Sequence, residues 1–134
     1  MELLKAAALV IAGGSVYVTV ELLWRGRSHP GMFALGGLCF YLLGLLDELA
    51  PGTPLAAQAV LGGALVTALE LVFGLLWNRG RRIWDYSGKP LNLRGQICLP
   101  YFTAWIALAA AAVPLDDALR LVLFAEPWPG LRLL

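Results

Sequence analysis

Histidine and cysteine are scarce in this sequence, which has one His and two Cys among 134 residues. His29 has no Cys or carboxylate at metal-ligand spacing, so we expect no metal centre. Cys39 and Cys98 both lie in apolar stretches, which argues against a disulfide framework. The His and Cys residues therefore predict neither a metal site nor a disulfide, and we expect no cofactor.

Charge is also scarce, because 14% of the residues are charged and 60% are hydrophobic. Soluble domains carry about 25% charged residues. A water-soluble fold of this length could not bury so much apolar surface, so the bilayer must act as solvent for much of it. The net charge of +1 provides no basic face for nucleic acid.

The sequence also lacks a set of residues for enzyme chemistry. The only His lies far along the chain from Ser87, so no Ser/His/Asp set is convincing. Lys89 follows a Gly but precedes Pro90, without the upstream Gly of a phosphate-binding loop. We therefore expect neither an enzyme nor a nucleotide-binding domain.

Four long apolar runs dominate what is present. A helix needs about 20 residues to cross a bilayer, and the runs lack the alternation of a membrane barrel. We predict an all-α integral membrane protein, a single domain over residues 1–134. The first run has no clear cleavage site, so we expect it to be retained. The expected transmembrane helices are Leu3–Trp24, Gly31–Leu46, Leu55–Trp77 and Gln96–Val113.

The tail at 114–134 predicts a further short helix. Pro114 followed by Asp116 and Asp117 is typical of a helix start. The stretch Asp116–Ala125 is too short to span, so we expect a C-terminal helix lying at the membrane interface or docked against the bundle.

Basic residues predict the orientation. Seven of the ten Lys and Arg residues fall in the first and third connections between the runs. The second connection has Asp47 and Glu48 but no basic residue. The positive-inside rule therefore predicts that both termini lie outside. The seven are Arg25, Arg27, Arg79, Arg81, Arg82, Lys89 and Arg94, and the remaining three are Lys5, Arg120 and Arg132.

The two halves of the chain, about 3–48 and 55–113, resemble each other. The stretch Gly13–Leu22 matches Gly62–Leu71, with Gly-Gly followed after six residues by Glu-Leu in both. This predicts an internal repeat of two helical hairpins, although Gly-rich apolar helices also match by chance. Further matches, at growing offsets, are Arg25–Arg27 with Arg79–Arg81, and Gly36 and Cys39 with Gly95 and Cys98.

Glu21 and Glu70 are the strongest candidate site residues. A carboxylate in hydrocarbon costs at least a few kcal/mol, so it needs a partner or water. One interpretation is a pair of related carboxylates facing a polar cavity that binds a proton, a cation or a cationic substrate. The alternative is local pairing, of Glu21 with Arg25 and of Glu70 with the Arg79–Arg82 cluster.

The connection between the third and fourth runs, RIWDYSGKPLNLRGQICL, is unusually rich in polar and aromatic residues. Trp84 and Tyr86 are typical of interfacial anchors. Asp85 can accept hydrogen bonds from Ser87 or from the backbone of the turn, or it can pair with an Arg of the Arg79–Arg82 cluster. Asn92 and Gly95 are expected near the N-terminal cap of the fourth span. The loop either fastens the structure or contacts a ligand.

This region resembles the hallmark of the bacterial ABC-transporter type IV permease family. The matching pattern is a Glu on a helix, then Trp-Asp-Tyr-Ser, then Pro, Asn and Gly, then Ile-Cys-Leu. The N-terminal stretch ELLWRGRSHPGMFALGGLCF is also similar to short members. The matching residues are Glu70, Trp84, Asp85, Tyr86, Ser87, Pro90, Asn92, Gly95, Ile97, Cys98 and Leu99.

The resemblance implies a permease or channel-like transport component of the bacterial inner membrane. Glu70 and Glu21 would face the polar site, and the loop would close it. Because the chain has no ATPase domain, an ATP-driven system would require a separate ATPase subunit. We expect membrane lipids and a second copy of the chain as partners. The alternative is an accessory or assembly protein that binds a partner subunit without transporting.

Overall fold

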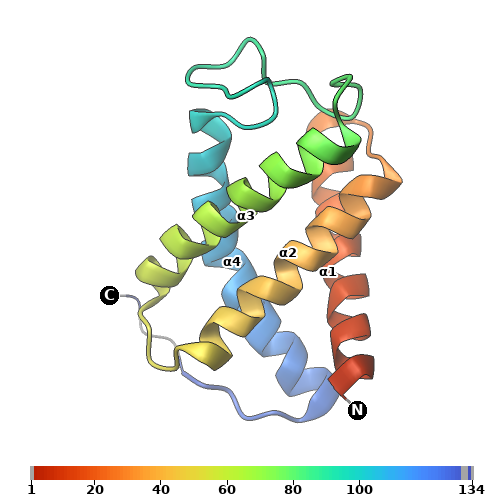
Figure 1. Cartoon of the computed structure of the whole chain (residues 1–134). Helices are drawn as coiled ribbons and strands as arrows, with labels where there is room; N and C mark the ends of the chain where they lie inside the picture. Colours follow the sequence, from red (N-terminus) through yellow and green to blue (C-terminus); the bar gives the residue numbers. More distant parts are fainter. Residues whose placement is uncertain (1, 131–132, 134) are drawn as a thin grey trace.

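The computed structural model describes residues 2–130 and 133, which form four helices (Figure 1). No strand occurs among these described residues, and Leu93 and Ile97 form an isolated bridge. Arg132, which entered the count of basic residues above, lies outside the described residues. The helices are α1 (Glu2–Arg25), α2 (Pro30–Leu49), α3 (Leu55–Trp77) and α4 (Leu99–Phe124).

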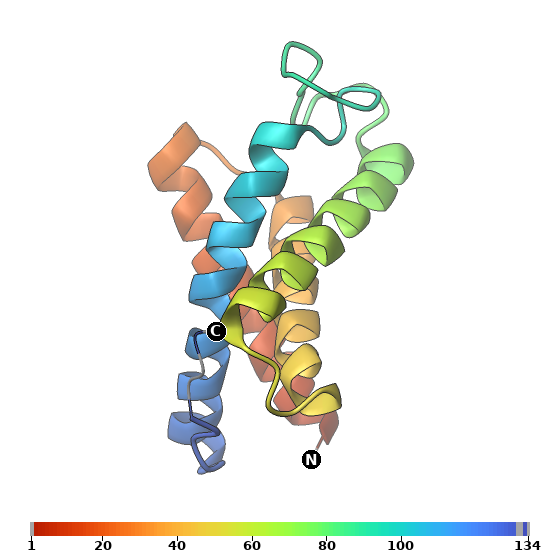
Figure 2. The same cartoon turned by 90° about the vertical axis from the view of Figure 1, so that its left-hand side faces the viewer.

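The helices pack as two antiparallel hairpins. α1 packs mainly against α2, α3 packs mainly against α4, and α1 and α4 touch at few places. The connections after α1 and α3 lie at one end of the molecule, and the connection between α2 and α3 lies at the other (Figures 1 and 2). α1, α2 and α3 are each long and apolar enough to cross a membrane. The prediction of an all-helical membrane protein is confirmed at this level.

The predicted separate C-terminal helix is wrong. α4 continues through Pro114 to Phe124 as one helix. Proline removes one backbone hydrogen bond, but it does not end a helix whose next turn is held by other contacts. Here Arg120 donates to Asp116 over 2.8 Å, and its guanidinium also pairs with Glu48 of α2. These ion pairs keep the last turns on the helix axis and dock them against the first hairpin.

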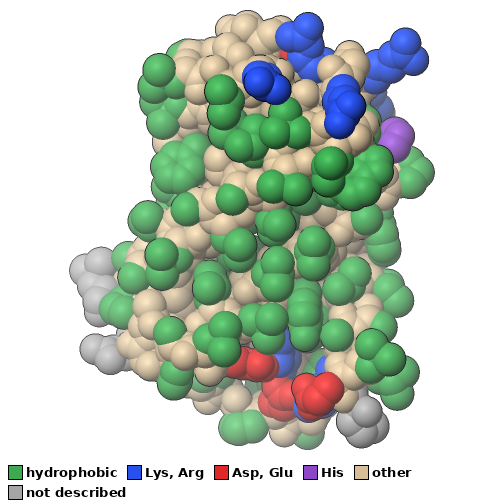
Figure 3. All heavy atoms as spheres, in the orientation of Figure 1, with side chains coloured by type: hydrophobic (Ala, Val, Ile, Leu, Met, Phe, Trp, Pro, Cys, Tyr) green, Lys and Arg blue, Asp and Glu red, His purple; other side chains and the backbone are tan. Residues whose placement is uncertain are grey.

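The two ends of the molecule carry opposite charges. Lys and Arg side chains gather at the end with the α3–α4 loop, and acidic side chains gather at the other end (Figure 3). A broad band between them is largely hydrophobic on this face. At the acidic end, Lys5 of α1 lies 2.6 Å from Glu126, just beyond α4.

Glycines bring the two helices of the first hairpin close together. A Cβ atom on Gly37 of α2 would collide with the backbone carbonyl oxygen of Val10 in α1, and one on Gly36 would approach the Tyr17 side chain within 2.6 Å. Close approach of this kind is a common way for membrane helices to gain packing contacts.

Replacing Gly37 with Ala should therefore destabilise the protein by about 1–3 kcal/mol, because a backbone oxygen cannot move aside as a flexible side chain can. Gly88→Ala is the matched control, since a Cβ there has nothing within 4 Å. Thermal unfolding in detergent measures both. Equal melting temperatures for the two variants would contradict the close packing of α1 on α2.

Candidate functional site

Glu70 lies in the interior, between α3, α4 and the α3–α4 loop. It is 2% exposed. Its Oε1 accepts a hydrogen bond from the Tyr86 hydroxyl at 2.7 Å, and its Oε2 accepts one from Trp105 Nε1 at 2.9 Å. Both carboxylate oxygens therefore have a neutral donor, and Glu70 forms no ion pair of 4 Å or less with the described residues. Pairing with the Arg79–Arg82 cluster, one alternative from the sequence, is not observed.

Tyr86 reaches Glu70 because the loop folds inward over the ends of α3 and α4. Its backbone N–H donates to the Gly95 carbonyl at 2.8 Å, and its ring stacks on Tyr101 with centroids 4.5 Å apart. Burial and the nearby Glu70 raise the pKa of the Tyr86 hydroxyl well above its ordinary value. Tyr86 therefore stays protonated and acts as the donor in its bond to Glu70.

Two buried amides hold the loop in this position. Asn78 follows α3 directly, and Gln96 lies two residues before the cap of α4. Asn78 Nδ2 donates to Gln96 Oε1 at 2.9 Å and to the Trp84 carbonyl at 2.7 Å, and Gln96 Nε2 donates to the Asn78 carbonyl at 2.8 Å. Trp84 Nε1 donates to the Gln96 carbonyl at 2.9 Å. The amides thus join the two ends of the loop in a closed network.

Gly74 makes room for this network. A Cβ atom on Gly74 would collide with the side-chain oxygen of Gln96. Gly74 lies one turn after Glu70 on α3. The same side of the helix therefore carries the Glu70 carboxylate and the space that the Gln96 side-chain amide occupies.

Trp84 and Tyr86 are buried, so their predicted role as interfacial anchors is wrong. They alternate with exposed Asp85 and Ser87, because this short extended segment directs every second side chain inward. The inward side chains fill the space beneath the loop.

The exposed part of the loop motif is held by local hydrogen bonds. Asp85 Oδ1 accepts from the Ser87 backbone N–H at 2.9 Å, which is one of the two interpretations from the sequence. Asn92 Nδ2 donates to the Ser87 and Lys89 carbonyls, and its Oδ1 accepts from the Gly95 N–H at 3.1 Å. Asn92 therefore organises the loop and does not cap α4, whose N-cap is Cys98. Pro90 is exposed in the same turn.

Asp85 provides a test of this loop geometry by pH. The Ser87 backbone N–H holds the pKa of the exposed Asp85 carboxyl below its ordinary value. A lowered pKa means that this contact is present above about pH 4 and is lost as the pH falls through the lowered value. We expect the Ser87 amide to lose protection as the pH falls from 6 to 2, measured by NMR with exchange rates corrected for the intrinsic pH dependence of amide exchange. Unchanged protection, or the same behaviour in Asp85→Asn, would contradict the contact.

Glu21 lies on α1 and is 5% exposed. Its Oε1 is 3.7 Å from the Arg25 guanidinium, one turn further along, so the local pairing considered from the sequence is present. Arg25 also donates to the Ile83 carbonyl at 2.9 Å and so connects α1 to the α3–α4 loop. Glu21 and Glu70 both line the space between the two hairpins.

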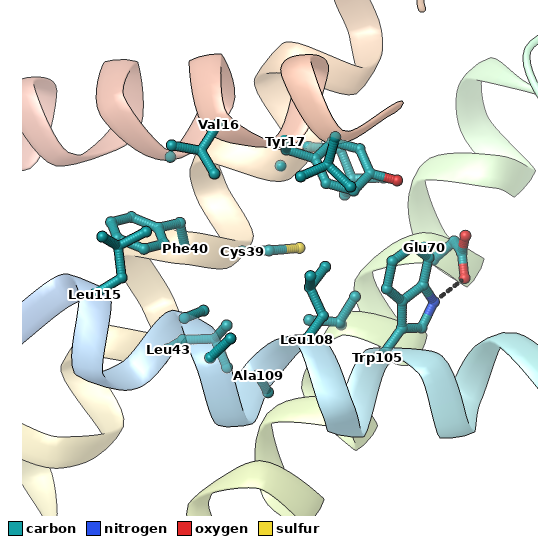
Figure 4. Close-up of a pocket in the computed structure, with 17 residues that line it drawn as sticks. Val16, Tyr17, Cys39, Phe40, Leu43, Glu70, Trp105, Leu108, Ala109 and Leu115 are labelled. Carbon is teal, nitrogen blue, oxygen red and sulfur yellow. Dashed lines mark hydrogen bonds between the residues drawn. The ribbon is translucent and has the colours of Figure 1, made fainter. Parts of the chain in front are cut away.

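Two adjoining cavities occupy that space. The first, of about 240 Å³, is almost entirely apolar and has Glu70 at one end (Figure 4). Figure 4 shows Val16 and Tyr17 of α1 on one side of it and Trp105, Leu108 and Leu115 of α4 on the other. The second cavity, of about 430 Å³, lies toward the loop and has Glu21 in its wall. Four residues line both cavities: Tyr17, Val20, Trp105 and Leu108.

Sequence analysis named Tyr86 but missed Trp105, the other partner of Glu70, and the two amides that hold the loop. Trp105 lies within an apolar run, where an aromatic residue is normally packing. Asn78 and Gln96 are uncharged amides at the junctions of a helix and a loop, but the burial that requires them to pair is not visible in the sequence. Tyr17, which lines both cavities, has no sequence pattern that distinguishes it from other residues of its apolar run.

These features define a small all-helical membrane protein with a carboxylate buried between its helices and a loop fastened over it. The chain belongs to the family described as "Putative ABC-transporter type IV", whose family model matches residues 11–123. The family resemblance of the sequence is thereby confirmed. No curated protein and no solved structure matches the chain.

Proposed function

We propose that the protein is the membrane-embedded transport component of a bacterial inner-membrane system, and that Glu70 and Glu21 belong to its transport site. One observation carries the proposal. Glu70 is a carboxylate buried within an apolar helix, and it has hydrogen-bond donors but no cationic partner among the described residues. Ionisable residues in such positions commonly mark ion or proton pathways.

The hydrogen bonds describe a closed site. Tyr86 from the loop and Trp105 from α4 occupy both oxygens of Glu70, and a transported proton or cation would displace one of them. Release of Tyr86 would open the first cavity to the second, where Glu21 and Arg25 lie. The loop would then act as the gate on the cytoplasmic side.

The charge distribution supports the orientation. The end with the α3–α4 loop carries the Lys and Arg side chains (Figure 3), so we place it in the cytoplasm and both chain termini outside. We also propose that α4 crosses the membrane up to about Val113 as a fourth span. Because the internal cavities are small, we propose a homodimer as the functional unit.

Liposomes containing the purified protein test this proposal. Proton flux is measured with entrapped pyranine and monovalent cation flux with radioactive rubidium, each driven by a potassium diffusion potential. Flux above that of empty liposomes supports the transport site. Tyr86→Phe loses the hydroxyl that bonds Glu70, so we expect its flux to be greater than that of the wild type. Both proteins at the background rate would refute transport of these ions.

The exposed side of the loop favours a second candidate, a non-transporting protein that binds a separate ATPase or another partner subunit. Arg81, Arg82 and Arg94 are exposed there and form no ion pair with the described residues. Co-purification in mild detergent tests this role. A partner lost on Arg82→Gln/Arg94→Gln, in a protein without flux, would favour it over transport.

A further inference from the structure

We propose that the space between α1 and α4 is a binding groove for a membrane phospholipid with an anionic headgroup. The two cavities form its two parts. The apolar cavity would hold an acyl chain, and the cavity at the basic end would hold the headgroup. This inference goes beyond transport and holds whether or not the protein moves a substrate.

The groove opens sideways, to the surface that faces lipid. α1 and α4 belong to different hairpins and touch at few places, so no helix covers the gap between them. The side chains at its rim are apolar but exposed: Val16 is 43%, Val20 is 40% and Leu108 is 36% exposed. In a membrane, acyl chains surround such a rim.

The dimensions match one leaflet. The lining residues on α1 run from Gly13 to Arg25 across the two cavities. Twelve residues of helix rise about 18 Å. Half of a bilayer's hydrocarbon core is about 15 Å. A lipid with its head at Arg25 would therefore place its chain alongside the apolar part of the groove.

The charges match a negative headgroup at one end only. The cavity near the loop is lined by Arg25, Arg27 and Lys89 against Glu21 and Asp85. Glu21 pairs with Arg25, and Asp85 keeps its charge and accepts the Ser87 N–H, so the charged lining residues sum to one net positive charge. The side chains of Arg27 and Lys89 form no ion pair with the described residues, so they remain to bind a phosphate.

Aromatic residues lie at the same depth as these basic groups. Trp24, which is 79% exposed, and Tyr101 line the cavity near the loop. Trp and Tyr are enriched where membrane proteins meet the headgroup region. The opposite end of the groove, lined by Gly13, Leu43 and Leu115, is apolar, as an acyl chain requires.

Native mass spectrometry of the purified protein, equilibrated with equal amounts of phosphatidylglycerol and phosphatidylcholine carrying identical chains, tests the headgroup site. We expect the protein to retain phosphatidylglycerol in preference, and Arg27→Gln/Lys89→Gln to lower that preference at least fivefold. The matched control is Arg82→Gln/Arg94→Gln, which removes the same charge at the same end but outside both cavities. It should change the preference less than twofold.

A second pair of variants tests the apolar part. Ala112 lines the apolar cavity, whereas Ala107 lies on the same helix and lines none of the three cavities found. Ala112→Phe should reduce retention of both lipids, and Ala107→Phe should not. Equal retention of the two lipids, equal losses in the variant pairs, or a lipid-free dimer that buries the groove would each overturn the proposal.

Discussion

Glu70→Gln is expected to abolish ion flux through the protein while leaving its fold intact. The amide oxygen can still accept from Trp105 Nε1, and the amide nitrogen can donate to the Tyr86 hydroxyl oxygen. Both contacts to Glu70 therefore survive in reoriented form, but the charge is gone. We expect flux at the level of empty liposomes and a stability change of about 1 kcal/mol or less.

Glu70→Leu separates charge from hydrogen bonding. It leaves the Tyr86 and Trp105 donors buried without an acceptor, and we expect it to destabilise the protein by about 2 kcal/mol, given the modest strength of such bonds in membrane proteins. Glu2→Gln is the control, because the Glu2 side chain is 90% exposed. Wild-type flux in a folded Glu70→Gln protein would remove this carboxylate from the mechanism.

Asn78→Leu is expected to release the α3–α4 loop. The change leaves the buried Trp84 carbonyl and Gln96 side-chain oxygen, and the partly buried Ile83 N–H, without their partner. The expected loss is about 3 kcal/mol, because each stranded buried group costs about 1–3 kcal/mol and some will find water. Hydrogen exchange should show rapid exchange across residues 79–95, including the Tyr86 amide.

Asn92→Leu is the matched control for that experiment. Asn92 also makes three hydrogen bonds within the loop, but it is exposed, so water can replace them. We expect a loss below about 1 kcal/mol and faster exchange only near residues 87–95. If both variants opened the whole loop equally, the buried amides would not be its principal fastening.

The helices could be predicted from the sequence because a long apolar run allows few structures in a bilayer. The prediction Leu55–Trp77 agrees with α3 at both ends. The second helix extends beyond the predicted Leu46 to Leu49, since Asp47 and Glu48 lie on its polar end. The C-terminal prediction failed because Pro114 and the acids after it resemble a helix start, whereas Arg120 neutralises Asp116 within one continuous helix.

The interior of the site was less predictable. That Glu21 and Glu70 lie within apolar helices follows from counting residues, but which donors reach them depends on how the loop folds. Trp and Tyr are typical of a membrane interface, so the sequence suggested that Trp84 and Tyr86 lie there. The Asn78–Gln96 network, formed between residues eighteen positions apart, instead holds this segment inward. Local sequence patterns do not encode such a pairing. The internal repeat stays a prediction: Cys39 lies within α2, whereas its proposed match Cys98 precedes α4.

The ion pair between Lys5 and Glu126 has a mechanical consequence. It ties the first helix to the residues just after the last helix at the acidic end, where Arg120 also joins Glu48. At the basic end, α1 donates one hydrogen bond to the loop, from Arg25 to the Ile83 carbonyl, and Met32 and Leu35 of α2 pack with Trp84 and Tyr86 in one apolar cluster. The two ends of the bundle therefore resist separation by different forces, ion pairs at the acidic end and mainly apolar packing at the basic end.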